Sequence, residues 1–380
     1  MNIDGTPKVI FSYTNDNNFL KGKGSQIPVF IGYTGNNPSA YGLKKFRDYT
    51  EASKIVSAGG IGRETENNII LKTIKKFFTE VRKVKVDDIT VPYIYVIDLG
   101  VKEPELSLST WADAIELSKN VYDAQVEVYT GFNQSDTPEK IIPIINTGIA
   151  SAIEYAKGGL PREIYGTVFD ADQDQIKEYT NDNNNKYVQS SWFGLIRPED
   201  FGKVIGVLCC TPTHEEPGYY NFRTIESGTY NTLSDEEAES LQSSGIIFIN
   251  DENAGTGGVV TRINLAVSTS FASTDPPNDA LLHHRRNVNQ LVRDLYPVIF
   301  KQLKRNETKV NIPYLRTDVN AIINEYISDG KMQKGTVADV VEVSTNPYTL
   351  AVRGTAVPVN STLKIDFTMY VDTPNAIGGE

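Results

Sequence analysis

The stretch Ile27-Pro28-Val29-Phe30-Ile31-Gly32-Tyr33 predicts a buried strand, because an apolar run bounded by Gly and Asn is typical of one. The segments after it alternate between helix and strand patterns. In residues 67–84, apolar side chains such as Phe77 and Phe78 recur at helical spacing, and residues 92–99 form a second apolar run. The alternation continues with a helix at 111–122, a strand at 124–129, a helix at 137–157 and a strand at 164–169. The whole pattern predicts α/β layering.

The second half of the chain adds further helices and a strand-rich tail. Residues 170–186 are polar and predict an exposed connection, while the apolar residues 203–210 predict a strand or a buried helix end. Ser234, with Glu237 three residues later, has the form of a capping box at the start of a helix. The remaining predicted elements are strands at 246–249 and 259–268, a helix at about 280–305 capped by Asn278 or Asp279 and kinked at Pro297, a helix at 317–328, and a hairpin or two long strands in the tail.

Each end of the chain carries the pattern of an isolated strand. The first consists of Val9, Ile10, Phe11 and Tyr13; one face of the last consists of Leu363, Ile365, Phe367, Met369 and Val371. Because a single strand is not stable alone, we expect these arms to pair with sheets of neighbouring subunits. Gly22 and Gly24 lie in a stretch without bulky apolar residues and predict a hinge behind the first arm.

Composition and charge argue against several classes of protein. The 380 residues carry a formal net charge of −11, which disfavours nucleic acid as the main partner, because phosphate binding needs a basic surface. No apolar run reaches about 18 residues, so we expect no membrane insertion. The first residues have neither the basic nor the apolar region of a secretory signal. We therefore expect synthesis in the cytoplasm.

The candidate chemical groups do not add up to a catalytic or cofactor site, so we expect no enzyme activity, no cofactor and no metal. Cys209 and Cys210 lie in an apolar run, which favours buried thiols over a nucleophile paired with His214. His283 and His284 have no carboxylate cluster or cysteine pair at ligand spacing. Three further candidates lack essential parts of their motifs: Gly255 to Gly258 as a phosphate loop, Asp170, Asp172 and Asp174 as a calcium loop, and Asp98 as a catalytic carboxylate.

Several segments, in order, resemble the contractile tail sheath family of myophages, pyocin-type particles and related injection systems. They are residues 27–35 followed by Lys45-Phe46-Arg47-Asp48-Tyr49, Phe201 to Val207, Leu233 to Glu237 with Leu241 and Gly245-Ile246, and Gly258 to Leu265 followed by Asn287-Val288-Asn289 at the head of a long helix. The sequence departs from the family pattern where Arg285 and Arg286 precede the Val-Asn pair, and the usual Trp-Gly after the hairpin is missing. The resembling segments extend over roughly residues 25–371.

The resemblance implies a multi-domain α/β (α+β) fold of the sheath type. Residues 1–24 would form an N-terminal arm joining the inner domain, and residues 25–270 an outer α/β domain, with a break near 170–200 if it has two subdomains. Residues 271–380 would form an inner domain of mixed sheet and helices with a C-terminal strand arm. The implied function is that of a structural subunit that polymerises around an inner tube and contracts to drive it through a target cell envelope. The implied partners are further copies of the chain, the inner tube protein, and the baseplate and tail terminator proteins, in a virion tail or injection particle.

The helix predicted at about 280–305 is the candidate for the tube-facing element. It carries the basic residues Arg285, Arg286, Arg293, Lys301, Lys304 and Arg305 against a single acid, Asp294. Exposed charge pairs are weak and screened by salt, which suits a contact that is released on contraction. Two alternatives stay open. The basic residues form a solvated face or bind carboxylates of neighbouring subunits, or the helix at 317–328 holds the tube.

Two other classes of function are compatible with an α/β chain of this length. One is a different virion component, a tube or baseplate protein, although tube proteins are typically much shorter and dominated by strands. The other is an α/β enzyme, which would need perturbed acids that converge in a pocket, and the sequence shows none.

Overall fold

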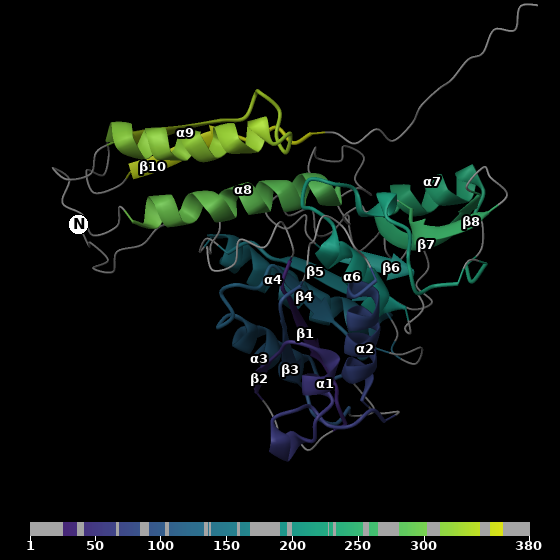
Figure 1. Cartoon of the computed structure of the whole chain (residues 1–380). Helices are drawn as coiled ribbons and strands as arrows, with labels where there is room; N and C mark the ends of the chain where they lie inside the picture. The colour runs from purple at the N-terminus through teal and green to yellow at the C-terminus, as the bar shows by residue number, and fades with distance from the viewer. Residues whose placement is uncertain are drawn as a thin grey trace, which may run out of the picture.

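The computed structural model describes residues 26–35, 42–65, 68–83, 91–102, 106–132, 136, 138–157, 160–167, 191–195, 200–226, 228–230, 233–253, 258–264, 281–301, 312–342 and 350–359. These residues form two parts (Figure 1). The sheet region, residues 26–264, is an eight-stranded sheet with helices on both faces. The hairpin region, residues 282–359, consists of two helices and a two-stranded sheet. The α/β fold predicted from the sequence is confirmed.

The large sheet has the strand order β2-β3-β1-β4-β5-β6-β7-β8. Its strands are β1 (Pro28–Gly32), β2 (Leu43–Phe46), β3 (Ile94–Asp98), β4 (Val126–Tyr129), β5 (Glu163–Thr167), β6 (Ser191–Leu195), β7 (Ile246–Asn253) and β8 (Val259–Ile263). The strands from β3 to β7 pair in parallel, and the edge strands β2 and β8 pair antiparallel to their neighbours. The apolar run at residues 27–33 contains β1, which lies in the interior of the sheet between β3 and β4.

Helices cover both faces of this sheet because its parallel strands are apolar on both sides. Phe30 of β1 belongs to a core formed with α2 (Ile69–Val81) and α6 (Phe201–Cys210), near α1 (Tyr49–Ala52). Val29 and Ile31 point to the opposite core, formed with α3 (Leu108–Ser118), α4 (Pro138–Lys157) and α7 (Asp235–Ser243). Two short 3-10 turns, Val56–Ala58 and Pro217–Tyr219, complete the described elements of the sheet region.

Local sequence signals fix several of these helices. The Asn68 side chain accepts a hydrogen bond from the Leu71 amide at 3.1 Å and caps α2. Ser234 and Glu237 form the predicted capping box of α7. Gly202 lets α6 pack directly on α2, since a Cβ atom at this position would lie 2.1 Å from the Thr73 carbonyl oxygen.

The hairpin region consists of α8 (Leu282–Phe300), α9 (Ile312–Ser328), β9 (Val337–Glu342) and β10 (Leu350–Thr355). β9 and β10 pair antiparallel, and α9 packs on β9. Their shared core consists of Leu291, Leu315, Val319, Ile323, Tyr326, Met332 and Val340. In Figure 1, α8 lies between the sheet region below it and α9 above it, and its carboxyl-terminal end extends beyond the sheet region.

The segment at 203–210, left open between a strand and a buried helix end, is helical and buried as part of α6, which confirms the second alternative. Other local predictions need correction. The short strands β2 and β6 were not predicted. The N-cap of α8 is Leu281, not Asn278 or Asp279; Leu282 is fully buried, so apolar packing fixes this helix start. α9 begins at Ile312 rather than Thr317, because Pro313 is tolerated in the first turn of a helix.

Candidate functional site

The predicted strand arms and hinge lie outside the described residues. This holds for Val9, Ile10, Phe11, Tyr13, Gly22, Gly24, Leu363, Ile365, Phe367, Met369 and Val371, and for Lys304 of the predicted tube-facing helix. The structure does describe the root of the first arm, Gln26, and most of α8. These two elements meet in a polar junction between the sheet region and the hairpin region.

Three of the arginines assigned to a tube-facing surface are buried inside this chain. Arg285, Arg286 and Arg293 have only 2%, 0% and 3% of their surface exposed. The prediction that they face an inner tube is wrong, because buried guanidinium groups are not available to a partner. The physical reason is that the amino-terminal half of α8 packs on the sheet region, where backbone carbonyls accept hydrogen bonds from Arg286 and Arg293. Lys301, at the other end of α8, is exposed.

Arg286 joins α8 to the end of α6 and to the start of the described chain. Its Nη2 donates to the carbonyl oxygens of Leu208 at 2.8 Å and Thr211 at 2.7 Å. These acceptors lie at the carboxyl end of α6, where the helix leaves carbonyls without partners and favours a positive charge. Its Nε donates to Oε1 of Gln26 at 3.2 Å.

Gln26, two residues before β1, is held from three sides. Besides the bond from Arg286, its backbone amide donates to the Cys209 carbonyl at 3.1 Å. Its side-chain amide makes a long contact of 3.5 Å with the carboxylate of Glu163, the first residue of β5. The root of the predicted N-terminal arm is therefore fixed to α6, α8 and β5 together.

Glu163 is the acidic group of this junction. Burial raises the pKa of its carboxyl above the usual range, although the positive charge of Arg286 opposes that shift. Its Oε2 accepts a hydrogen bond from the Tyr165 hydroxyl at 2.8 Å. Burial also lowers the pKa of Arg285, the residue before Arg286 in α8, to about 9, so its guanidinium stays charged at neutral pH. The junction is thus a buried polar contact rather than an apolar one.

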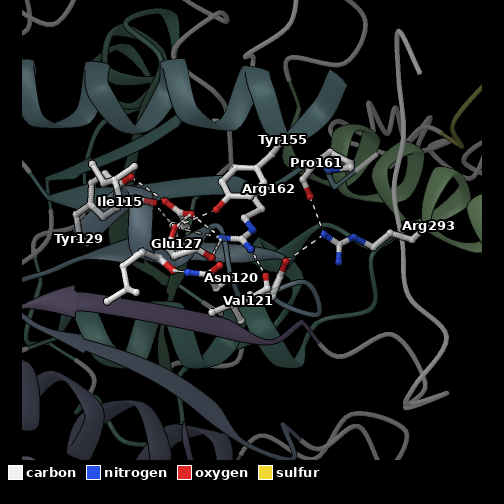
Figure 2. Close-up of polar contacts among 12 residues, drawn as sticks. Ile115, Asn120, Val121, Glu127, Tyr129, Tyr155, Pro161, Arg162 and Arg293 are labelled. Carbon is white, nitrogen blue, oxygen red and sulfur yellow. Dashed lines mark hydrogen bonds and ion pairs between the residues drawn. The ribbon is translucent and has the colours of Figure 1, made fainter. Parts of the chain in front are cut away.

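Arg293 adds further hydrogen bonds between α8 and the sheet region. Its Nη2 donates to the carbonyls of Pro161 at 2.8 Å and Ala124 at 3.1 Å, which precede β5 and β4 (Figure 2). One guanidinium group of α8 therefore donates hydrogen bonds to the loops that precede two adjacent strands. The amino-terminal edge of the parallel sheet is the surface to which α8 binds.

A second buried arginine stabilises that edge from inside the sheet region. Arg162 pairs with Glu127 at 2.7 Å, donates to the carbonyls of Ser118 at 3.1 Å and of Val121, and lies over the Tyr155 ring at 4.0 Å (Figure 2). Glu127 in turn accepts hydrogen bonds from the Ser118 and Tyr129 hydroxyls at 2.7 and 2.8 Å. Because both charges are buried and bonded, this network fixes α3, β4 and α4 relative to β5.

The cysteine and histidine candidates and Asp98 are buried or paired with nearby residues. Burial raises the pKa of Cys209 well above its ordinary value and that of Cys210 to about 12, so both are protonated thiols at neutral pH. His283 Nδ1 lies 3.0 Å from Glu216 Oε2. Asp98 accepts hydrogen bonds from Thr34 Oγ1 at 2.6 Å and from the Gly100 amide at 2.7 Å, and so closes a turn after β3.

The described residues contain neither a metal-binding cluster nor a membrane-spanning helix. In that part of the chain, no group of three or more His, Cys, Asp and Glu side chains could hold a metal ion. No helix described there is both long enough and apolar enough to cross a membrane.

Sequence reasoning missed Glu127, Arg162 and Gln26. A usable signal existed for Glu127, since a lone acid inside the apolar strand Val126–Tyr129 requires a buried partner. Arg162 directly precedes a buried strand and could have been proposed as that partner. Nothing in the sequence marks Gln26, because its role depends on carbonyls and side chains that are distant along the chain.

Comparison with known proteins identifies solved structures of similar fold. No known family model matches the sequence, and no curated protein matches it. A chain in the cryo-EM structure of the anti-feeding prophage helical sheath, in its contracted state, superposes with a TM-score of 0.64 at 10% identity, covering 98% of each chain.

Two further structures agree. A chain in the anti-feeding prophage baseplate gives a TM-score of 0.65 at 10% identity over 98% of this chain and 100% of that one. The crystal structure of the sheath tail protein of Desulfitobacterium hafniense gives 0.57 at 8% identity over 92% and 100%. The chain therefore has the fold of contractile tail sheath proteins, as the sequence predicted.

Proposed function

We propose that this chain, with its sheath-type fold, is a structural subunit that polymerises around an inner tube and contracts to drive that tube through a target cell envelope. The observation that carries the proposal is the match to a contracted sheath over 98% of both chains, which leaves no large segment of either without a counterpart. The particle would be a virion tail or a related injection particle. Its other partners would be the inner tube, the baseplate and the tail terminator.

The mechanism that we infer is mechanical and does not require a nucleotide. Subunits assemble in an extended packing, and contraction takes them to a second packing of lower free energy. Each subunit moves as a rigid body if its own parts do not separate. The buried contacts of Arg286 and Arg293 support this, because they join the hairpin region to the sheet region through hydrogen bonds on four backbone carbonyls.

The strand arms of neighbouring copies would hold the subunits together during this movement. The small sheet offers a place for them, since β9 and β10 pair with each other and, among the described residues, with no other strand. A two-stranded sheet is marginally stable alone and is completed by added strands. Gly22 and Gly24 would act as the hinge between the first arm and the fixed Gln26.

Deleting residues 1–20 tests the role of the first arm. We expect a folded monomer with an unchanged melting temperature that does not polymerise at any concentration at which the full chain does. Normal polymers from the truncated chain would overturn the assignment of the arm.

We propose α9, the competing helix of the sequence analysis, as the tube-facing element, because three of the arginines of α8 are buried. Tyr314 of α9 is 70% exposed, and Asp318 and Asn324 are exposed as well. Replacing Asp318 by Lys should change the salt dependence of co-sedimentation with purified tube, while the same change at Asp113 on α3 should not.

Electron microscopy of the purified full chain tests the proposed function as a whole. We expect hollow cylinders that lengthen as the protein concentration rises. Particles of constant small size over a hundredfold range of concentration would contradict a sheath function.

A baseplate subunit is the second candidate, because a baseplate chain is as similar to this one as the sheath chain, with TM-scores of 0.65 and 0.64. The same micrographs distinguish the two. A baseplate subunit would form closed assemblies that stop growing, whereas a sheath subunit continues to add along one axis.

A further inference from the structure

The outer face of α2 is basic. Lys72 and Lys75 are exposed, and Lys76 is half-buried beside them; Arg82 and Lys83, directly after the helix, are exposed as well. The one acid of the helix, Glu80, is buried and accepts hydrogen bonds from the Arg223 amide at 2.7 Å and from the Thr224 hydroxyl, so it does not neutralise this face. Glu64 pairs with Lys75 at 2.6 Å but lies at one end of the row. In a chain of net charge −11, such a positive helix face is distinctive.

The outer face of α7 is acidic. Asp235, Glu236, Glu237 and Glu239 are all exposed, and the helix contains no basic residue. Glu237 belongs to the capping box with Ser234, and acids in the first turn stabilise a helix start. Glu239 lies beyond the first turn, so helix capping does not account for its charge.

These two helices lie on opposite faces of the large sheet and cannot meet within one chain. Ile70, Ile74 and Phe77 of α2 belong to the core on the α6 side of the sheet. Leu241 of α7, with Ala238 packed against it, belongs to the core on the α3 and α4 side. One subunit therefore presents a positive helix on one face and a negative helix on the other.

We propose that the basic face of α2 in one subunit binds the acidic face of α7 in a neighbouring copy. The inference rests on the proposed function and adds the surfaces through which copies recognise each other. A contact between two different faces is heterologous, and repeating it generates a ring or a helical assembly instead of a closed dimer. A second copy is the partner because the chain supplies the complementary charge itself, whereas its overall negative charge repels a nucleic acid.

Charge reversal with rescue tests this pairing. The first variant carries Lys72→Glu and Lys76→Glu, which leaves the Lys75 pair with Glu64 intact. The second carries Glu236→Lys and Glu239→Lys, which leaves the capping box intact. At low salt, each variant alone should need about a tenfold or higher protein concentration to polymerise, since attractive pairs become repulsive. An equimolar mixture should polymerise at nearly the wild-type concentration, because every contact again joins opposite charges.

Controls separate this inference from folding and from the proposed function. Lys140→Glu with Lys334→Glu makes the same change of charge as the first variant at exposed lysines elsewhere and should assemble like wild type. Circular dichroism and melting temperature verify that each variant is folded. If wild type forms cylinders and both reversed variants do so equally well, the pairing is wrong while the sheath function stands. If the variants fail alone and the mixture fails too, α2 binds another surface, and the pairing is again wrong.

Discussion

The two halves of α8 differ in which side chains they bury. The amino-terminal half buries polar and charged residues, whereas the carboxyl-terminal half leaves apolar residues partly exposed. From Leu282 to Asn287 every residue is buried, although most of them are polar or charged. From Asp294 to Ile299 the residues are mostly apolar but only half-buried, and Phe300 is 52% exposed. The first half meets the sheet region, where backbone carbonyls accept hydrogen bonds from Arg286 and Arg293. In the second half, Leu295, Val298 and Ile299 pack against the thin core of the hairpin region.

The comparison indicates where each region obtains its stability. The sheet region buries apolar side chains on both faces of its sheet, so it has two cores and can support buried ion pairs. The hairpin region has a single core between one pair of helices and a two-stranded sheet, an arrangement of low intrinsic stability. We infer that the hairpin region depends on α8 and its polar junction, and the following experiments test that difference.

The largest effect is expected inside the sheet region, from Arg162→Met. The change leaves Glu127 buried without its cation, and breaking such a pair costs about 3–5 kcal/mol. The free energy of unfolding in urea measures it. If the variant does not fold, the double variant Arg162→Met with Glu127→Gln still gives a readout, since it removes the uncompensated charge and should recover more than half of the loss. A double variant as unstable as the single one would contradict this account of the network.

A smaller effect, confined to the junction, is expected from Arg286→Met. The carbonyls of Leu208 and Thr211 lose their donor, at a cost of about 1–3 kcal/mol. Hydrogen exchange should accelerate in α8 and α9 and stay slow in α3 and α4. Lys301→Met, an exposed change on the same helix, is the matched control and should move stability by less than about 0.5 kcal/mol. Faster exchange throughout the sheet region would show that the junction is not a separate unit.

The same substitution in both regions sharpens the comparison further. Ile74 is fully buried in the sheet region, and Ile323 is 3% exposed in the hairpin region. Ile→Val costs about 0.5–1.5 kcal/mol in a tight core. We expect Ile74→Val near the upper end and Ile323→Val near the lower end, because the thinner core relaxes more easily. Equal losses for the two variants, measured by urea unfolding, would argue against a difference in packing.

The smallest effect is a dependence of stability on pH from Asp294 of α8. Burial raises the pKa of this carboxyl above its ordinary value, and the charge of Glu325 adds to that shift. The Tyr326 hydroxyl at 2.5 Å, Gln290 and the charge of Lys331 oppose it. A group with a raised pKa stabilises the fold most at low pH and loses that contribution as pH rises through the folded-state value. Relative to Asp294→Asn, wild type should therefore become less stable between pH 4 and pH 7. A parallel pH profile for the two proteins would exclude this role.

Much of the sheet region was predictable because its signals are local. The apolar run at β1, the helical spacing of Ile70, Ile74 and Phe77, and the capping box at Ser234 each lie within a few neighbouring residues, and all three elements are present. The edge strand β2 escaped prediction because it is short and half polar.

The junction was not predictable, because its partners are distant in the sequence. Charged residues are usually exposed, so Arg286 and Arg293 were assigned to a surface that faces the tube. Their acceptors are backbone carbonyls 75 to 169 residues away, and a carbonyl gives no signal in a sequence because every residue has one. Only the assembled sheet edge brings these acceptors together.

The close packing of α6 on α2 has a consequence for the substitutions that this fold tolerates. Identity to the solved sheath structures is only 8–10%, so the same fold is compatible with different residues at most positions. Position 202 is constrained differently, because any side chain there would collide with the Thr73 carbonyl oxygen. A variant must keep glycine at this position or separate the two helices. The distance between α2 and α6 is therefore set by the absence of one side chain.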